Sequence, residues 1–202
     1  MQKIEILRND TFSLSERYTS YGEEFVKNLT ASYDCPKNSS VEKFFRDNAL
    51  NSCIQGITQS HYVVTTIDGE SFFTGFFTLA NKVVNIKREN VSSTFFRKIK
   101  KFGYYETLTD SVTVSVPLIA QLGKNFNKDN DKLISGKELL MIACDKVRKA
   151  QDIIGGRTVF LECEDIPKLT AFYIDNGFVS FGRRAPGEGD DGDLIQMIRY
   201  QR

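Results

Sequence analysis

The pattern of hydrophobic and polar positions changes along the chain, and its first part is typical of helices. Residues 13–30 mix polar and aromatic positions, and residues 39–57 bring apolar side chains to one helical face. Ser39 and Glu42 have the spacing of a capping box at the start of this second helix. Its apolar face consists of Val41, Phe44, Phe45, Ala49 and Cys53. The sequence therefore predicts a helical part over residues 1–58.

From His61 onward the pattern becomes that of strands. Residues 61–67 and 71–86 are rich in β-branched and aromatic side chains, and Asp68-Gly69 between them is a strong hairpin signal. Residues 112–125 predict another strand, in which Pro117 indicates an edge or a bulge. The basic segment 87–103 between these strands is less regular, so no element is assigned to it.

The last third alternates between strands and helices. Apolar residues at helical spacing predict helices over residues 134–154, which Gly155-Gly156 end, and over residues 165–176. Short apolar runs predict strands at 157–164, 178–182 and 194–200, and an acidic, glycine-rich loop occupies residues 183–193. The order of elements predicts one mixed α/β (α+β) domain, with a helical part at 1–58 and a sheet core at 59–202.

The composition excludes several classes of protein. The chain has 202 residues and a formal charge of +1, so its bulk charge does not indicate nucleic-acid binding. No apolar run approaches the ~20 residues that a membrane span needs, and no signal peptide is recognisable. Cys35, Cys53, Cys144 and Cys163 are far apart and lack metal-ligand spacing. We therefore expect a cytoplasmic protein with buried, reduced thiols and no bound metal.

The stretch NKDNDKLISGKELL, residues 127–140, has two incompatible interpretations. As a calcium loop it aligns acidic and polar residues with the ligand positions of an EF-hand. Lys132 then occupies the sixth position, where an EF-hand needs glycine because the chain turns sharply there. Calcium binding is therefore disfavoured. The aligned positions are Asn127, Asp129, Asp131, Ser135 and Glu138.

As a helix start, the same stretch could hold a phosphate. Ser135 and Glu138 have capping-box spacing, and Gly136 leaves the first backbone N–H groups uncovered. A helix N-terminus attracts anions, and Lys132 and Lys137 would add positive charge. Capped helix starts are common, and the glycine motifs of dinucleotide and nucleoside triphosphate sites are absent. The residues alone leave a phosphate site and an ordinary helix start both open.

The order of elements, with one motif, resembles the GNAT superfamily of acetyl-CoA-dependent N-acetyltransferases. Phe172-Tyr173 on a helix, followed by Gly177-Phe178 at a strand start, is similar to that family's tail, and the resemblance covers about residues 59–200. Asp131 stands where the family's coenzyme loop has Arg or Gln, Ile134 replaces its first glycine, and only Gly136 matches. The N-terminal segments SVEKFFRDNAL and HYVVTTID are similar to the branch that includes toxins acetylating charged tRNA.

The resemblance implies a central, mostly antiparallel, splayed sheet flanked by helices, with acetyl-CoA as co-substrate. It implies direct transfer of acetyl to a primary amine on a small molecule, a protein or a charged tRNA, with Tyr173 protonating the departing thiolate. A catalytically inactive binding module and a homodimer are also compatible with it. The implied coenzyme-binding residues are Leu122, Gly123, Lys124, Asn125, Lys132, Leu133, Ile134, Ser135, Gly136 and Lys137.

Other candidate residues stay open between a functional and a structural role. His61, the only histidine, is expected to be structural rather than a general base. Glu162 and Glu164 could orient an amine at the end of a strand, or simply be solvated. The bases at 97, 98, 100 and 101 lie among aromatic residues, so they could contact RNA or line an exposed amphipathic helix.

Overall fold

The computed structural model describes residues 6–187 and 192–201, and side chains from residue 9 onward. The chain divides into two compact units, Met1–Ala80 with Gln121–Ala143, and Asn81–Ala120 with Cys144–Arg202. Each unit is described by itself. Three elements, β3, β5 and α5, have residues in both.

The first unit contains an antiparallel sheet in the order β1 (Ile6–Ser13), β2 (Gln59–Ile67) and β3 (Glu70–Lys87). The predicted hairpin is confirmed, because β2 and β3 pair from Ile67 and Glu70 onward. The turn residues Asp68 and Gly69 have φ angles of 49° and 85°, as a tight two-residue turn between twisted strands requires.

The prediction of a helical N-terminal part is wrong for β1. Its residues pair antiparallel with β2, from Ser13 opposite His61 to Ile6 opposite Ile67. The sequence of this strand, ILRNDTFS, shows no clear alternation of apolar and polar residues. Strand β1 is the first in the sheet order, and an edge strand can carry polar residues in its middle. Pairing with residues about fifty positions away stabilises it, and no local pattern reports that contact.

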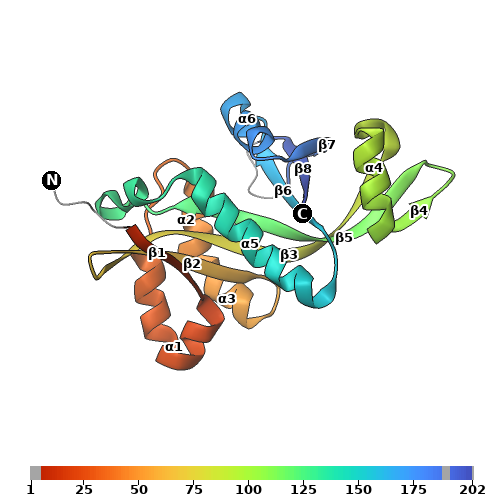
Figure 1. Cartoon of the computed structure of the whole chain (residues 1–202). Helices are drawn as coiled ribbons and strands as arrows, with labels where there is room; N and C mark the ends of the chain where they lie inside the picture. Colours follow the sequence, from red (N-terminus) through yellow and green to blue (C-terminus); the bar gives the residue numbers. More distant parts are fainter. Residues whose placement is uncertain (1–5, 188–191, 202) are drawn as a thin grey trace. The chain divides into compact units, whose positions relative to one another are not determined.

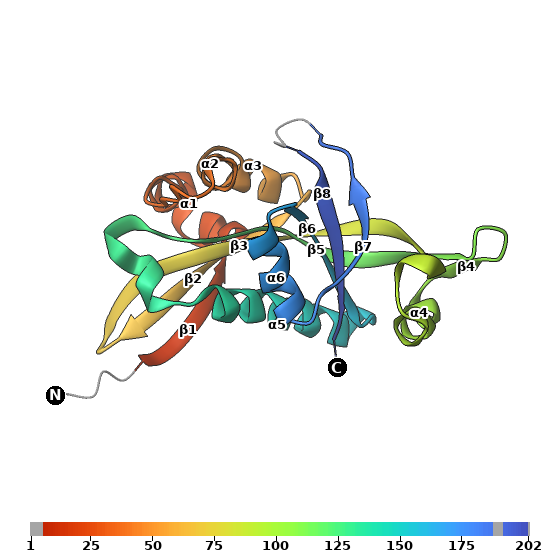
Figure 2. The same cartoon turned by 90° about the horizontal axis from the view of Figure 1, so that it is seen from above.

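Helices cover one side of this sheet. Helix α1 (Leu14–Ala31) is interrupted at Gly22, and α2 (Ser39–Lys43), the π-helical turn η1 (Phe44–Asn48) and α3 (Ala49–Ile54) follow. Figure 2 shows α1, α2 and α3 together on one side of β2 and β3. The expected apolar face is confirmed, and their core consists of Leu14, Val26, Tyr33, Cys35, Phe45, Ala49, Cys53, Tyr62 and Phe76.

The predicted capping box at Ser39 is wrong by one residue. The N-cap of α2 is Asn38, whose Oδ1 accepts the N–H of Val41 at 3.0 Å. The Glu42 carboxylate instead accepts the N–H of Cys35 at 2.7 Å. Asn and Ser are almost equally good caps, so the choice between neighbours depends on the tertiary contact that Glu42 makes.

The second unit contains the order β5 (Ser111–Lys124), β6 (Thr158–Glu164), β8 (Leu194–Tyr200) and β7 (Val179–Arg184), with β4 (Tyr104–Glu106) paired to β5. The β5–β6 pair is parallel, joining Leu118 to Phe160 and Ile119 to Leu161, and the other pairs are antiparallel. Pro117 comes directly before this parallel stretch. The expected fold class, a mostly antiparallel open sheet flanked by helices, is confirmed.

A segment between β3 and β5 is more regular than the sequence indicated. It contains η2 (Arg88–Asn90), α4 (Ser93–Ile99) and η3 (Lys100–Phe102) before β4 begins. Phe96 and Ile99 of α4 are buried against Val112 and Val114 of β5. Figure 1 shows α4 beside β4. We call residues 87–110 the insert.

The remaining helices agree with their predictions. Helix α5 (Gly136–Ile154) buries Leu139, Leu140, Ala143 and Val147. Helix α6 (Pro167–Asp175) begins with its proline in the first turn. The four cysteines are free and buried, as expected. Part of the predicted 183–193 loop, residues 188–191, lies outside the described residues. Among the described residues, no helix is long and apolar enough to cross a membrane.

Candidate active site

The end of β5 in the first unit is fixed by the buried side chain of Asn125. Its Nδ2 donates to the carbonyl of Phe73 (3.0 Å), and its Oδ1 accepts the N–H groups of Asp34 (3.0 Å) and Asn127 (3.1 Å). The N–H of Asn125 itself donates to the carbonyl of Thr74 at 2.9 Å. Residues 122–125 were expected to meet the thioester. Asn125 instead fixes the end of the strand, and its N–H is already engaged.

Strand geometry divides the other three residues. Successive residues of a strand direct their N–H groups to opposite sides. Because the N–H of Asn125 points to β3, the N–H groups of Leu122 and Lys124 are directed away from β3, and that of Gly123 toward it. Leu122 and Lys124 are thus the candidate donors to an acyl oxygen.

The side chain of Lys124 holds the loop that follows. Its ammonium donates to the carbonyl oxygens of Asp131 (2.6 Å) and Ile134 (3.2 Å), and lies 3.6 Å from the Asp131 carboxylate. The two side chains are only 27% and 18% exposed. Asp131, which stands where the resembled family has Arg or Gln, is therefore neutralised from within the site. Sequence analysis missed this pair, because Lys124 and Asp131 are seven residues apart and no local pattern reports the contact between them.

The loop itself is a 3-10 segment, η4 (Asn127–Leu133). Lys128 and Asp129 have φ angles of 52° and 62°, in the left-handed region. Side-chain amides anchor the segment, since Nδ2 of Asn127 donates to the carbonyl of Ser32 (2.8 Å) and Nδ2 of Asn130 to that of Phe73 (3.1 Å). Side-chain amides thus anchor this segment, which lacks the glycines of the resembled family's coenzyme loop.

The same contacts remove the ligands of the calcium interpretation. The Asp129 carboxylate pairs with Lys132 at 3.0 Å, Asp131 pairs with Lys124, and Glu138 bonds to Ser135. Within the part of the chain that the structure describes, no group of three or more His, Cys, Asp or Glu could hold a metal ion.

The capping box at the start of α5 is confirmed. The Ser135 Oγ accepts the N–H of Glu138 (3.1 Å), and the Glu138 carboxylate accepts the N–H of Ser135 (2.8 Å). A hydrogen bond from the Ser135 side chain to the Glu138 carboxylate, and then the one from the Ser135 N–H, hold the pKa of Glu138 below its usual value. The N–H of Ser135 is therefore engaged, and Gly136 and Lys137 provide the first-turn N–H groups that remain for an anion. Ile134, by contrast, is buried.

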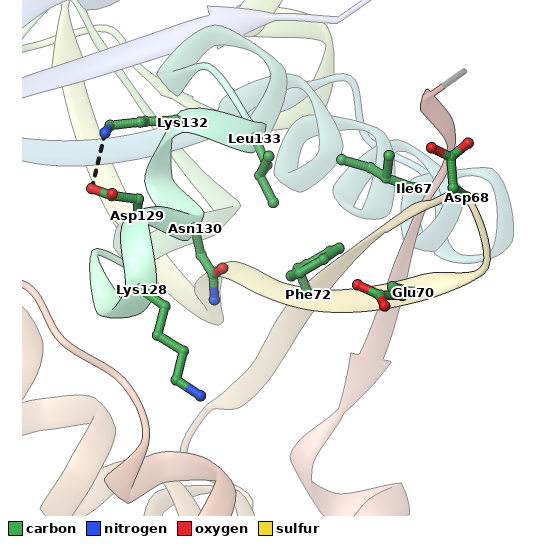
Figure 3. Close-up of a pocket in the computed structure, with 9 residues that line it drawn as sticks. All are labelled: Ile67, Asp68, Glu70, Phe72, Lys128, Asp129, Asn130, Lys132 and Leu133. Carbon is green, nitrogen blue, oxygen red and sulfur yellow. Dashed lines mark ion pairs between the residues drawn. The ribbon is translucent and has the colours of Figure 1, made fainter. Parts of the chain in front are cut away.

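A cavity of about 560 Å³ lies between η4 and the β2–β3 hairpin. In Figure 3 the side chains of Ile67, Phe72 and Leu133 face a common space, with Lys128 and the Lys132–Asp129 pair on the η4 side. Leu133 and Lys132, two of the expected coenzyme-binding residues, therefore line a hollow on the first unit.

Gly123 contacts a residue that sequence analysis did not single out. A Cβ at position 123 would clash with the Tyr33 hydroxyl and lie 2.9 Å from Cγ1 of Val41. The Tyr33 side chain is fully buried, and its hydroxyl has no hydrogen-bond partner among the described residues. Burial, with the nearby Cys35, Glu42 and Asp34, raises the pKa of Tyr33 far above its ordinary value, so the phenol stays protonated.

Tyr173 lies in the second unit, on the buried side of α6. It is 9% exposed and packs against the rings of Phe172 and Phe178 at 5.1 and 5.8 Å. Burial, with smaller contributions from Cys163 and Cys144, raises the pKa of Tyr173 above its ordinary value. The phenol therefore carries its proton at every physiological pH, which is the state that a proton donor needs.

The other candidates have structural contacts of their own. His61 stacks on Phe77 with 5.2 Å between ring centroids, as expected for a structural histidine. Oε2 of Glu162 accepts from Arg184 at 3.1 Å and Oε1 from Gln196 at 3.0 Å, which ties this carboxylate to β7 and β8. A role for Glu162 in orienting an amine would require these bonds to rearrange.

The insert of the second unit concentrates positive charge. It carries six Lys or Arg and three Asp or Glu, and no acidic residue occurs between Glu89 and Glu106. Lys100 lies 3.2 Å from the centre of the Tyr105 ring and Lys98 5.1 Å from that of Tyr200. A cavity of about 310 Å³ is lined by Arg88, Ser93, Phe96, Arg97, Lys100, Tyr105 and Asp110.

Comparison with known proteins identifies the fold. No protein-family model and no curated protein matches this chain. A Tyr-to-Phe mutant of KacT is similar over 94% of this chain and 94% of its own, with a TM-score of 0.61 and 16% identity. AtaT complexed with acetyl-methionyl-tRNAfMet is similar over 93% and 94%, with a TM-score of 0.59 and 16% identity.

A Tyr-to-Phe mutant of AtaT bound to the C-terminus of the antitoxin AtaR and acetyl-CoA is similar over 82% and 83%, with a TM-score of 0.50 and 14% identity. At these identities the likeness establishes the fold, which is the GNAT-like fold of these toxins.

Proposed function

We propose that the protein is an acetyl-CoA-dependent N-acetyltransferase that acts on a primary amine. The observation that carries the proposal is the hydrogen-bonded unit formed by the end of β5, η4 and the capped start of α5, in a fold shared with a toxin solved with acetyl-CoA. This unit presents backbone N–H groups and lysines, which are the groups that would bind the diphosphate and the thioester of a coenzyme.

The roles of the residues follow from their geometry. The N–H groups of Gly136 and Lys137, with the charges of Lys132 and Lys137, would hold the diphosphate. The N–H groups of Leu122 and Lys124 would face the acyl oxygen and stabilise negative charge developing on it. When bound, acetyl-CoA would supply an acyl thioester for direct attack by the amine of the acceptor.

Tyr173 would give its proton to the departing thiolate. Its buried phenol is protonated, but the raised pKa also makes it a weaker acid, so it depends on close contact with the sulfur. Tyr173→Phe should lower turnover by about 100-fold or more, with the acetyl-CoA affinity unchanged within about twofold. Thiol release from acetyl-CoA with a panel of amines measures turnover, and Tyr62→Phe, whose hydroxyl bonds to Arg17 and has no proposed role in binding, is a matched control. Unchanged turnover would remove Tyr173 from the mechanism.

Isothermal titration calorimetry with acetyl-CoA tests the proposed function itself. Wild-type protein should bind with a dissociation constant between about 1 µM and 1 mM, the usual range for a substrate. Absence of binding up to about 1 mM would refute the enzyme and favour a GNAT-like binding module.

A second candidate, acetylation of the amino group of aminoacyl-tRNA, is favoured by the insert. Arg97, Lys98, Lys100 and Lys101 are exposed, and no described residue forms an ion pair with them. Tyr104 and Phe102 beside them are 71% and 38% exposed, so cations and aromatic faces are available together. Such a surface suits a nucleic-acid backbone with unstacked bases. AtaT, a neighbour in fold, was solved with an acetylated methionyl-tRNA.

The two candidates differ in their dependence on the insert. If the acceptor is charged tRNA, the protein should transfer labelled acetyl to total aminoacyl-tRNA. The double variant Arg97→Ala with Lys101→Ala should then reduce the steepness with which the logarithm of the tRNA-binding constant falls with the logarithm of the salt concentration, by about 1 to 2. Lys82→Ala with Lys168→Ala removes the same charge elsewhere and should leave the slope unchanged. If the two double variants change the slope equally, or if no acetyl is transferred to charged tRNA, the second candidate is refuted and only the first remains.

A further inference from the structure

The cavity in the insert is lined by more positive than negative side chains. Three of the side chains that line it are cations, Arg88, Arg97 and Lys100, and one is an acid, Asp110. Three cations against one acid leave the lining with a formal charge of +2. The cations come from η2, α4 and η3, so the fold of the insert brings them to one hollow.

The acid of the cavity is engaged and helps to hold Arg88. The Asp110 carboxylate accepts the Tyr105 hydroxyl at 3.0 Å, and its other oxygen lies 3.9 Å from Nε of Arg88. Nη2 of Arg88 donates to the Ser93 hydroxyl at 3.4 Å, and the guanidinium lies 5.8 Å from the centre of the Phe96 ring. Contacts with three residues therefore position Arg88, while its Nη1 has no hydrogen-bond partner among the described residues.

The other two cations have no acidic partner. No described residue forms an ion pair with Arg97 or Lys100, and both are exposed. The Lys100 ammonium lies 3.2 Å from the centre of the Tyr105 ring, so an aromatic face rather than a carboxylate positions it. Like charges that meet at one cavity repel each other, and an anion bound between them would remove that repulsion.

We propose that this cavity binds a phosphomonoester, the terminal phosphate group of a ligand. Such a group carries a charge of about −1.5 to −2 at pH 7 and three acceptor oxygens, which suits a lining with a formal charge of +2. A phosphodiester has a single charge, so it would neutralise the cavity less completely. The guanidinium groups of Arg88 and Arg97 are of the kind that forms bidentate hydrogen bonds with phosphate. A volume of about 310 Å³ holds the phosphate and part of the group that carries it.

This site is separate from the residues assigned to the coenzyme. Those residues lie between Leu122 and Lys137, in the first unit, whereas the cavity belongs to the second. The inference therefore goes beyond the proposed function. A protein that fails to bind acetyl-CoA would refute the proposed function and would still be expected to bind a phosphomonoester here.

Calorimetry with inorganic phosphate at low salt tests the site. Wild-type protein should bind phosphate with a dissociation constant of about 1 mM or lower, and at least about fivefold more tightly than dimethyl phosphate, a singly charged diester. Arg97→Gln should weaken phosphate binding about tenfold. Lys87→Gln is the matched control, because it removes the same charge from an exposed residue of the insert that does not line the cavity. It should change the affinity by less than about twofold.

Three outcomes would overturn the inference. The first is no phosphate binding up to about 10 mM, and the second is equal affinity for phosphate and the diester. The third is an equal effect of Arg97→Gln and Lys87→Gln, which would show that the anion binds outside the cavity or responds only to overall charge. Arg97 has no ion pair to lose, so Arg97→Gln should melt at the wild-type temperature. If it does not fold, Lys100→Gln provides the same comparison.

The same titration distinguishes two sources of the phosphomonoester. A short RNA with a terminal phosphate is compared with the same RNA ending in a hydroxyl, and with a nucleoside monophosphate. If an RNA end is the ligand, the phosphorylated RNA should bind at least about tenfold more tightly than both. Equal affinity of the phosphorylated RNA and the nucleotide, both lowered by Arg97→Gln, would identify a small phosphorylated ligand. If the terminal phosphate has no effect on RNA binding and the nucleotide does not bind, the inference is wrong.

Discussion

Lys124→Met tests whether one ammonium group holds the η4 segment in place. The substitution keeps the apolar part of the side chain and removes the donor to two carbonyl oxygens and the neighbour of the Asp131 carboxylate. Since both side chains are less than a third exposed, the loss is that of a partly buried, charge-assisted contact, about 2 kcal/mol in the free energy of unfolding. For a chain of this length, that corresponds to a melting temperature lower by about 4 to 8 °C.

The Lys132–Asp129 pair is a natural control. Its two atoms are closer, at 3.0 Å, but the side chains are 70% and 74% exposed. Solvent screening makes such a pair contribute little, so Lys132→Met should cost less than about 0.5 kcal/mol. The Lys124–Asp131 pair is longer but less exposed than the Lys132–Asp129 pair. Comparing the two substitutions therefore separates the effect of burial on stability from the effect of distance.

Charge repair completes the test. In Lys124→Met the Asp131 carboxylate is left unneutralised beside the expected diphosphate, so acetyl-CoA affinity should fall about tenfold. Adding Asp131→Asn should restore part of the affinity, but not the carbonyl contacts, giving a coupling of about 1 kcal/mol in a double-mutant cycle. Urea unfolding and calorimetry measure the two effects. Stability equal to wild type in Lys124→Met, or no recovery in the double variant, would refute the reasoning.

Two further substitutions probe the same unit. Asn125→Ala removes three hydrogen bonds of a buried side chain and should lower the free energy of unfolding by about 3 kcal/mol in urea titrations; a loss below about 1 kcal/mol would contradict the contacts described. Ser135→Ala should cost about 1 kcal/mol at pH 7. The pKa of Glu138 is lowered in the folded state, so its contribution is present above its unfolded pKa and lost as the pH falls through the folded one. Thermal melts should therefore show a smaller difference from wild type at about pH 3 than at pH 7, and a constant difference would exclude the carboxylate.

The elements that sequence analysis predicted correctly depend on neighbours in the chain. Asp68-Gly69 turns by its own backbone preferences, and Ser135 and Glu138 bond to each other across one helical turn. Such contacts leave a pattern within a few residues, so sequence can report them.

The features that it missed depend on residues far apart in the sequence. Strand β1 is stabilised by β2, and the role of Asn125 is defined by carbonyl and amide groups near residues 34 and 73. The packing of Tyr33 against Gly123 likewise joins two residues far apart in the sequence. Tyr173, by contrast, was found through a local motif, but its burial required the structure.

The left-handed backbone at Lys128 and Asp129 has a consequence for sequence searches that rely on glycine motifs. Glycine usually occupies such positions because it adopts them without strain, whereas other residues destabilise the turn by about 1 kcal/mol or more each. Here the amides of Asn127 and Asn130 hold the turn in place of glycine. A search for glycine spacing will overlook chains that build a left-handed turn in this way, whereas a search for asparagines bonded to distant carbonyl groups would retrieve them.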